Sequence, residues 1–226
     1  MLITQQSLAP LTAFAPYWQL HFWHSRWTNT AAIQELKQLI LAQEPLLIEE
    51  FRARQHHHGG TGLSANTLTA QYRFYNLFHR YAQEPAVQAL QQEIARCHRH
   101  MLAALGLEYT DCVIMGWANV LRQDQQIQAH NHGAKEYSYL SGNLCLDDYA
   151  TDTVYANPWD PAVKYPQASR QGSMTLFPSA VTHWVTDCHH LEPRVTVAWD
   201  ILPRRLCALH PPLEGYIRVD LDRVLR

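Results

Sequence analysis

The chain of 226 residues has no excess of positive charge: 18 Lys and Arg residues stand against 20 Asp and Glu, a formal net charge of −2. Proteins that bind nucleic acid use Lys and Arg to neutralise phosphates, so this balance argues against such a partner. No apolar run approaches the ~20 residues of a membrane-spanning helix. The start, MLITQQSLAPLTAF, lacks the basic and apolar regions of a signal peptide. We predict a soluble, cytoplasmic protein that binds neither nucleic acid nor membrane.

Cysteine is also scarce, and its pattern excludes two kinds of site. The five cysteines are an odd number and form no Cys-x-x-Cys pair, which argues against a zinc ribbon or a dithiol redox motif and fits a reducing compartment. Charged residues make up only 17% of the chain, against about 25% in an average protein. Histidine is the exception, with 14 residues, and this excess of imidazole suggests a metal site.

The apolar content indicates a folded globular protein. Hydrophobic residues make up 47% of the chain, with 7 Trp, 11 Tyr and 6 Phe among them, which is enough for a sizeable core. Because there is no internal repeat or long linker, we expect a single domain over residues 1–226. Within it we expect a helix-rich N-terminal support over 1–108, a β core over 109–203 and a C-terminal extension over 204–226.

Two helices are predicted in the first half of the chain. Asn29 or Thr30 can cap the first, whose apolar residues recur at helical spacing until Pro45, which we expect to stop it. The second follows Pro85, and Gly106 suits the position just past its end. The apolar positions are Ala32, Ile33, Leu36, Leu39 and Ile40 in the first helix, and Val87, Leu90, Ile94, Cys97, Met101, Leu102 and Leu105 in the second.

From Tyr109 onward, short runs of β-branched, aromatic and aliphatic residues alternate with turns. The runs are CVIMGWANVL (112–121), KEYSYLSGNLCLDD (135–148), DTVYAN (152–157), SMTLFP (173–178), HWVTD (183–187) and PRVTVAWDIL (193–202). Six such runs without helical patterns between them predict an antiparallel sandwich or barrel, with the two helices against one sheet. Its connections would hold Pro158, Pro161, Pro166 and Pro178.

The densest group of chemically active residues is QAHNH (128–132), followed much later by His183. His130 and His132 are two residues apart, so in an extended segment both side chains point to the same face and can meet at one ion. A third histidine from a neighbouring strand would complete three facial ligands and leave positions open for substrate and oxygen. Neutral imidazoles suit Fe, Zn, Cu or Ni. The alternative is that these are ordinary surface or core histidines in a histidine-rich chain.

Several short motifs surround these histidines in a specific order: GWANV (116–120), QAHNH (128–132), SGNL (141–144), VYANP (154–158), GSMTLFPS (172–179) and RVT (194–196). In this order they resemble the iron- and 2-oxoglutarate-dependent oxygenases of the double-stranded β-helix, or jelly-roll, fold. The resemblance covers residues 60–202 and is firm from residue 116 onward. It implies a mainly β protein with flanking helices, in which a jelly roll over 109–203 is buttressed by the N-terminal helices.

The resemblance also implies roles for individual residues. His130 would be the first ligand of Fe(II), His183 the distal ligand, and Arg194 the partner of the far carboxylate of 2-oxoglutarate. A guanidinium grips a carboxylate with two parallel hydrogen bonds and keeps its charge at all working pH values. Thr196, on the same face of the strand as Arg194, would add a hydroxyl. Asn119, or a tyrosine such as Tyr137 or Tyr139, would also assist.

The sequence departs from the commonest pattern of this superfamily at residue 132. The usual triad is two histidines and one carboxylate, but His132 stands where Asp or Glu is expected. The site could be a three-histidine site, or His130 and His183 could bind alone with water. A different register would make His132-Gly133-Ala134 similar to the His-x-Ala of halogenases. The other candidate ligands are Glu136, Asp147, Asp148 and Asp187, each more typical of a solvated carboxylate.

Together these observations predict an Fe(II)- and 2-oxoglutarate-dependent dioxygenase. It would use molecular oxygen to hydroxylate an unactivated carbon of a small-molecule or peptide-like substrate. Two alternatives stay open: a three-histidine, cupin-like oxygenase that needs no 2-oxoglutarate, and a non-catalytic binding protein on the same fold. The N-terminal aromatics Trp18, Phe22, Trp23 and Trp27 would suit a homodimer interface, or packing across the sheet.

Overall fold

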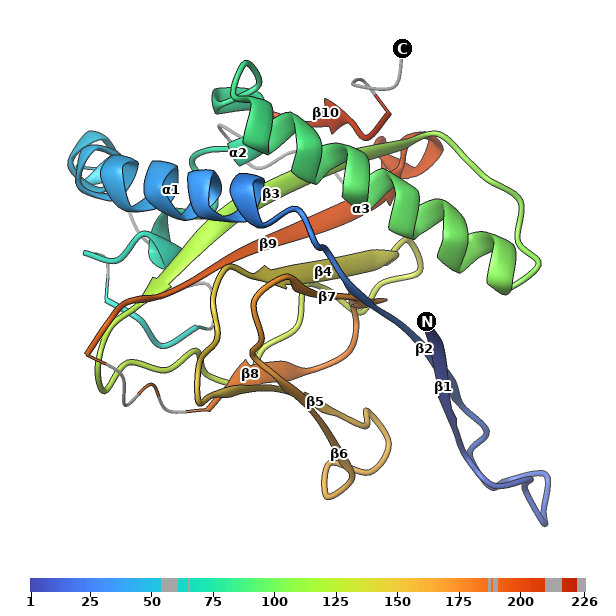
Figure 1. The fold of residues 1–226 in the computed structure, drawn as a ribbon. Coiled ribbons are helices and arrows are strands. Elements are labelled where there is room, and N and C mark those ends of the chain that lie inside the picture. The colour runs from blue at the N-terminus through green and yellow to red at the C-terminus, as the bar shows by residue number, and fades with distance from the viewer. Residues whose placement is uncertain (54–60, 65, 187, 189–190, 210–216, 223–226) are drawn as a thin grey trace.

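Two antiparallel sheets form the centre of the computed structural model, which describes all residues except 54–60, 65, 187, 189–190, 210–216 and 223–226 (Figure 1). The larger sheet has seven strands in the order β1-β2-β7-β4-β9-β3-β10, and the smaller has three in the order β6-β5-β8. The strands of the larger sheet are β1 (Leu2–Gln6), β2 (Gln19–Arg26), β7 (Ser173–Pro178), β4 (Leu140–Cys145), β9 (Arg194–Pro203), β3 (Cys112–Leu121) and β10 (Val219–Asp220). Those of the smaller are β6 (Lys164–Ala168), β5 (Asp152–Ala156) and β8 (His183–Val185).

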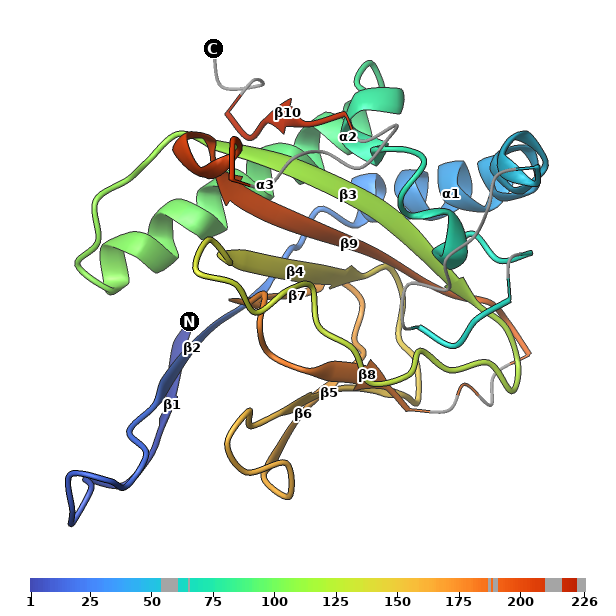
Figure 2. The same ribbon diagram turned by 180° about the vertical axis from the view of Figure 1, so that it is seen from behind.

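Helices α1 (Thr30–Phe51) and α3 (Pro85–Ala104) cover one face of the larger sheet, and the smaller sheet lies on its other side (Figures 1 and 2). The short helices η1 (Thr69–Gln71), α2 (Leu77–Arg80) and η2 (Arg204–Leu206) complete the fold. The prediction that helices buttress one sheet is therefore confirmed. The main core lies between these helices and the sheet, and a smaller one lies between the two sheets.

The predicted helix boundaries hold at three of four ends. The Asn29 side chain caps α1 by accepting a hydrogen bond from the amide of Ala32 at 3.2 Å, and α3 begins at Pro85. Gly106 follows α3 with φ +66°, a backbone conformation that glycine adopts without steric cost.

The prediction that Pro45 stops the first helix is wrong, because α1 continues through it to Phe51. A proline inside a helix lacks the amide for one hydrogen bond and costs about 3 kcal/mol. Beyond it, Leu47 and Phe51 are 2% and 3% exposed and extend the buried stripe of Ile40. Burying two large side chains supplies a free energy of the same size, so tertiary packing outweighs the local penalty.

Four strands were not predicted. β1, β2 and β10 lie in the segments expected to support or extend the β core, and all three join the larger sheet. β6 contains Pro166, which we expected in a connection. β6 is the outer strand of the smaller sheet, and an edge strand tolerates a residue without an amide hydrogen. By contrast, the runs predicted over 112–121 and 173–178 coincide with β3 and β7.

The N-terminal aromatics pack within the chain. Phe22 and Trp27 are 2% and 8% exposed, and Trp18 stacks on Trp159 with ring centroids 5.6 Å apart. Trp23 packs against the main core. These side chains therefore follow the packing alternative, and a homodimer stays a prediction.

Strand β9 shows how the larger sheet separates the core from the inter-sheet space. Successive side chains of a strand point to opposite faces. Val195, Val197, Trp199 and Ile201 join the core beneath the helices. Arg194, Thr196, Ala198 and Asp200 line a cavity on the other side. One strand thus contributes both to stability and to the candidate site.

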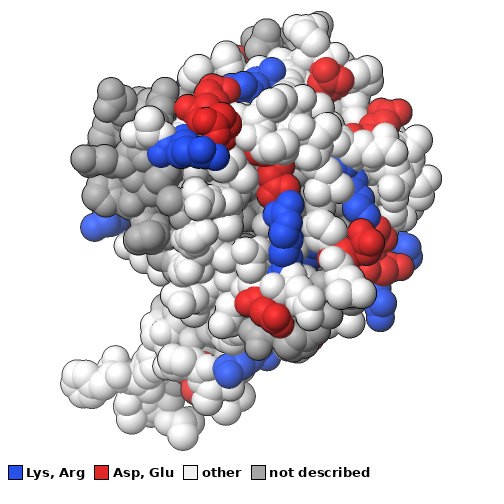
Figure 3. Space-filling model, turned by 90° about the vertical axis from the view of Figure 1, so that its left-hand side faces the viewer, with Lys and Arg blue, Asp and Glu red and all other residues white. Residues whose placement is uncertain are grey.

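The surface agrees with the balanced charge of the sequence. On the face shown in Figure 3, basic and acidic side chains are interspersed and most of the surface is uncharged. Among the described residues, no helix has both the length and the apolar character needed to cross a membrane.

Candidate functional site

A cavity of about 370 Å³ opens between the two sheets. Its walls come from β3, β4, β7 and β9 of the larger sheet, β5 and β8 of the smaller sheet, the segment 127–133, and the N-terminal residues Thr61, Thr69, Tyr72 and Arg73. His130, His132 and His183 all line it, together with Arg194. The structure therefore brings the predicted metal ligands and the predicted carboxylate partner into one space.

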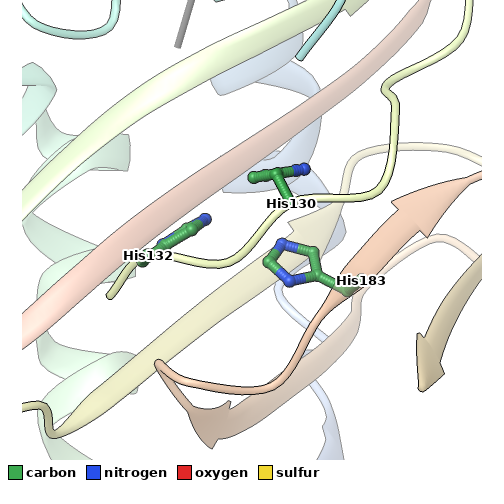
Figure 4. A group of neighbouring side chains, drawn as sticks. All are labelled: His130, His132 and His183. Atoms are coloured by element: carbon green, nitrogen blue, oxygen red, sulfur yellow. The ribbon is translucent and has the colours of Figure 1, made fainter. Parts of the chain in front are cut away.

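The three histidines form a compact group. One ring nitrogen from each lies within 4.8 Å of the others, a spacing that suits one shared ion. His130 and His132 lie on one extended segment and His183 faces them from β8 (Figure 4). Two backbone hydrogen bonds fix this arrangement: the amide of His130 donates to the carbonyl of His183 at 3.0 Å, and the amide of His183 donates to the carbonyl of His130 at 2.8 Å.

Each imidazole uses its Nδ1 for a contact outside the group. Nδ1 of His130 donates to the carbonyl of Gln128 at 2.8 Å, and Nδ1 of His183 donates to the carbonyl of Val181 at 3.1 Å. A carbonyl only accepts, so both Nδ1 atoms carry the proton. The lone pair is then on Nε2. This is the tautomer of a histidine that binds a metal through Nε2, and the Nδ1 hydrogen bond holds the ring in the matching orientation.

Burial also favours the neutral form of the His130 and His183 imidazoles. Desolvation, followed by repulsion from His132, lowers the pKa of His130 to about 4. Burial, and then the proximity of His132 and His130, lowers the pKa of His183 well below its ordinary value. A neutral imidazole is the form that donates a lone pair to a metal, so the donor set fits Fe(II) or a similar divalent ion.

His132 has a different kind of partner. Its Nδ1 donates to Oδ1 of Asp200 at 2.6 Å, and Ser141 donates from its hydroxyl to the same oxygen at 2.6 Å. Asp200 was not among the residues predicted from the sequence. The sequence could have predicted it, because every second residue of a strand points to the same face. Along β9 this places Asp200 on the same face as Arg194 and Thr196.

None of the other carboxylates that we considered as ligands joins the histidine group in the described part of the chain. Asp147 pairs with Lys37 at 2.7 Å, and Asp148 accepts from the amide of Gln171 at 2.9 Å. Glu136 is exposed. Asp187 lies outside the described residues. The geometry therefore favours the three-histidine alternative for the ligand set.

Arg194 is the second polar centre of the cavity. It is only 2% exposed, and its described hydrogen-bond partners include no carboxylate: they are the hydroxyls of Thr151 at 3.0 Å, Ser169 at 3.1 Å and Thr153 at 3.5 Å, and Sγ of Cys145 at 3.9 Å. No carboxylate of the described residues pairs with it. A buried charge without a counter-ion is costly, so this guanidinium is suited to an anionic ligand.

Thr196 and Asn119 lie on the same side of the sheet as Arg194. They are paired across β9 and β3, and the amide nitrogen of Asn119 donates to the hydroxyl of Thr196 at 3.4 Å. Oδ1 of Asn119 is buried and has no hydrogen-bond partner among the described residues. A buried acceptor of this kind is rare in folded proteins and fits a ligand that carries a donor, or a bridging water.

Tyr139, which the resemblance also suggested for the cosubstrate, does not join this group. Its hydroxyl contacts Nε2 of His98, on α3, at 2.8 Å, and it lines a separate cavity of about 240 Å³. Tyr139 lies just before β4 begins at Leu140, outside the regular alternation of that strand, and its side chain turns toward α3 rather than toward Arg194. Tyr149, whose ring lies 5.8 Å from the Arg194 guanidinium, contacts it instead.

Solved structures of similar shape carry the fold that the sequence predicts. A prolyl-4-hydroxylase of Pseudomonas putida has a TM-score of 0.51 at 11% identity, covering 81% of this chain and 92% of that one. A prolyl hydroxylase of Trichoplax adhaerens, in complex with a hypoxia-inducible factor peptide, has a TM-score of 0.52 at 12% identity, with 84% and 87% covered. SnoK, an α-ketoglutarate-dependent carbocyclase of nogalamycin biosynthesis, has a TM-score of 0.52 at 10% identity, with 88% and 91% covered.

These likenesses confirm the predicted fold: the chain is a double-stranded β-helix of the kind found in 2-oxoglutarate/Fe(II) oxygenases. No protein-family model matches the chain, and no curated protein matches it significantly. At 10–12% identity a shared fold does not transfer chemistry, so the activity has to be argued from the site.

Proposed function

We propose that this protein is an Fe(II)- and 2-oxoglutarate-dependent oxygenase. The observation that carries the proposal is one cavity holding both a three-histidine group and a buried arginine without a carboxylate partner among the described residues. The first is suited to a divalent metal and the second to a dicarboxylate that reaches it. The solved structures of the same fold include enzymes named for this chemistry, which agrees with the proposal.

His130, His132 and His183 would hold the iron through Nε2. When bound, Fe(II) with 2-oxoglutarate and oxygen supplies the oxidising power to remove hydrogen from an unactivated carbon. Arg194 would bind the far carboxylate of 2-oxoglutarate with its planar guanidinium. Thr196 and Asn119 would add a hydroxyl and an amide group near that carboxylate. These residues would orient the cosubstrate and exclude water from the site.

A three-histidine oxygenase that needs no 2-oxoglutarate is the second candidate. It is favoured by one observation, that His132 stands in the ligand group where a carboxylate is usual. Arg194 argues against it, because such an enzyme has no need of a buried guanidinium that lacks a carboxylate partner among the described residues. We therefore rank it behind the 2-oxoglutarate-dependent reaction.

The substrate we propose is a small or peptide-like molecule, because the cavity is only about 370 Å³. We also propose a reducing, cytoplasmic environment. All five cysteines are free thiols and four of them are buried, as expected for a chain that does not depend on disulfides.

The test is a titration of the anaerobic, iron-loaded protein with 2-oxoglutarate, followed by visible absorption. We expect a charge-transfer band from the chelate in the wild type and its loss in Arg194→Gln. Tyr139→Phe is the matched control and should keep the band, because Tyr139 contacts His98 instead of Arg194. Bound iron without a band would favour the three-histidine oxygenase, and a protein that binds no iron would refute both enzymes.

A further inference from the structure

The cavity contains a second arginine, Arg73, which the proposed function does not use. Arg73 lies in the N-terminal segment just after η1, is half-buried, and lines the cavity together with Tyr72. Arg194 is almost fully buried by comparison. The cavity therefore has two guanidinium groups, one deep in the fold and one nearer to solvent.

Arg73 is held so that its terminal nitrogens stay available. Its Nε donates to the hydroxyl of Tyr72 at 2.6 Å, and its guanidinium carbon lies 5.2 Å from the centre of that ring. Among the described residues, no carboxylate pairs with it and no acceptor meets its two terminal nitrogens. Two parallel donors are the arrangement that binds a carboxylate.

The segment that carries Arg73 is anchored to the site on both sides. Upstream, the amide of Gln128 donates to the carbonyl of Thr61 at 2.9 Å, two residues before His130. Downstream, the hydroxyl of Tyr75 accepts from the amide of Ala118, on β3, at 2.9 Å. These bonds tie the chain on either side of Arg73 to the segment that carries His130 and to β3.

A series of aromatic side chains connects Arg73 to the three histidines. Tyr72 and Trp117 have ring centroids 5.4 Å apart, and Trp117 and His132 also lie 5.4 Å apart. The other apolar walls include Ile127, Phe177 and Val185. An apolar or aromatic molecule lying along these rings would place one end near Arg73 and the other near the histidines.

The charged side chains that line the cavity also favour an anionic ligand at Arg73. Its formally charged lining residues are Arg73, Arg194 and Asp200, and Asp200 already accepts from His132 and Ser141. In the proposed function, 2-oxoglutarate offers one carboxylate to Arg194 and its keto acid end to the metal. The positive charge of Arg73 is then left for a different molecule.

We infer that Arg73 binds the carboxylate of the substrate, and that the substrate is a small carboxylic acid with an apolar or aromatic body. This inference rests on the proposed function for the assignment of Arg194. It narrows the substrate class, because an internal residue of a polypeptide has no free carboxylate at its backbone. Amino acids, chain termini and other small organic acids offer that group.

The test compares 3-phenylpropionate with 3-phenylpropionamide, which match in size and differ in charge. Both are titrated calorimetrically into metal-free protein, and into anaerobic iron-loaded protein saturated with 2-oxoglutarate. We expect the wild type to bind the carboxylate at least about tenfold more tightly than the amide, and Arg73→Gln to lose this preference. Arg73→Lys should recover only part of it, since an ammonium lacks the planar pair of donors. Arg170→Gln, an exposed arginine outside the cavity, is the matched control and should change nothing.

The outcomes separate this inference from the proposed function. Equal binding of the two probes by the wild type, or an unchanged preference in Arg73→Gln, overturns the inference. A variant Arg73→Gln that weakens 2-oxoglutarate binding and leaves the preference intact also overturns it, because Arg73 would then serve the cosubstrate. A preference for the carboxylate in metal-free protein that Arg73→Gln abolishes, together with no chelate band in the iron-loaded protein, would instead refute the proposed function and support the anion site.

Discussion

Nδ1 of His132 lies 2.6 Å from Oδ1 of Asp200, a residue 68 positions further along the chain. His132 occupies the position where a carboxylate ligand is usual in this fold, and Asp200 supplies a carboxylate behind it. A carboxylate that accepts from Nδ1 orients the ring and makes Nε2 a stronger donor to a metal. The negative charge that is absent from the ligand group is thus present one hydrogen bond away.

We expect Asp200→Asn to weaken metal binding by roughly 10-fold to 100-fold, because the amide is neutral and polarises the imidazole less. The measurement is competition with a chelator of known affinity for Zn(II) and, anaerobically, Fe(II). Asp111→Asn, at an exposed position, is the control. Unchanged affinity in Asp200→Asn would mean that Asp200 does not support the metal site, and that His132 binds without help from its partner.

Much of the fold followed from residue patterns. The strands over 112–121 and 173–178 were predicted to the residue because their apolar runs end at turns, and Gly106 ends α3 as expected. The missed strand β6 is an exposed edge with a proline, so it lacks the apolar run that marks a strand. The continuation of α1 beyond Pro45 was missed because helix propensity describes only local sequence. It does not include the burial of Phe51, which stabilises the last turns.

Some residues of the candidate site could be predicted from the sequence and others could not. His130 and His132 were found because they share one extended segment, and His183 because of its motif. Asp200 could have been found by alternation along β9. Arg73 could not, because it lies in an irregular segment that reaches the cavity only through tertiary packing. Tyr139 lies apart from this group, because it just precedes β4 and its hydroxyl contacts His98 on α3.

Gly142 is predicted to be required for packing rather than for chemistry. A Cβ atom at this position would lie 2.5–2.6 Å from the indole of Trp199, which is fully buried on the helix side of the sheet. We expect Gly142→Ala to lower the free energy of unfolding by about 2 kcal/mol, measured by urea denaturation, and to leave metal affinity unchanged. In the background of Trp199→Phe, the smaller ring should reduce that loss. The same loss in both backgrounds would show that the indole does not cause it.

His98 is predicted to make the protein less stable in acid. Burial lowers its pKa to about 4 from an ordinary 6.5. Between these values the unfolded chain takes up a proton that the folded protein does not, so stability is full above pH 6.5 and falls as the pH drops toward 4. The shift corresponds to about 3 kcal/mol.

The measurement is the free energy of unfolding of metal-free protein at several pH values between 4 and 7. The slope should be shallower in His98→Gln than in the wild type, while His79→Gln, at an exposed position, should keep the wild-type slope. Should His98→Gln fail to fold, NMR titration of the wild-type imidazole provides the answer. Protonation of His98 in the folded protein near pH 6.5 would contradict the prediction.

Replacing Pro45 is predicted to stabilise the folded protein. Inside α1 it lacks the amide hydrogen that would bond to the carbonyl of Leu41, four residues earlier. Replacing it with alanine should recover part of the roughly 3 kcal/mol by which proline disfavours a helix interior, offset by the greater freedom of the unfolded chain. We expect Pro45→Ala to raise the free energy of unfolding by about 1–2 kcal/mol in urea denaturation. Leu46→Ala, at the exposed neighbouring position, should change it by far less. A loss of stability in Pro45→Ala would mean that the packing of Leu47 and Phe51 depends on the backbone conformation that proline imposes. The residue expected to stop the helix would then be needed to position its last turns.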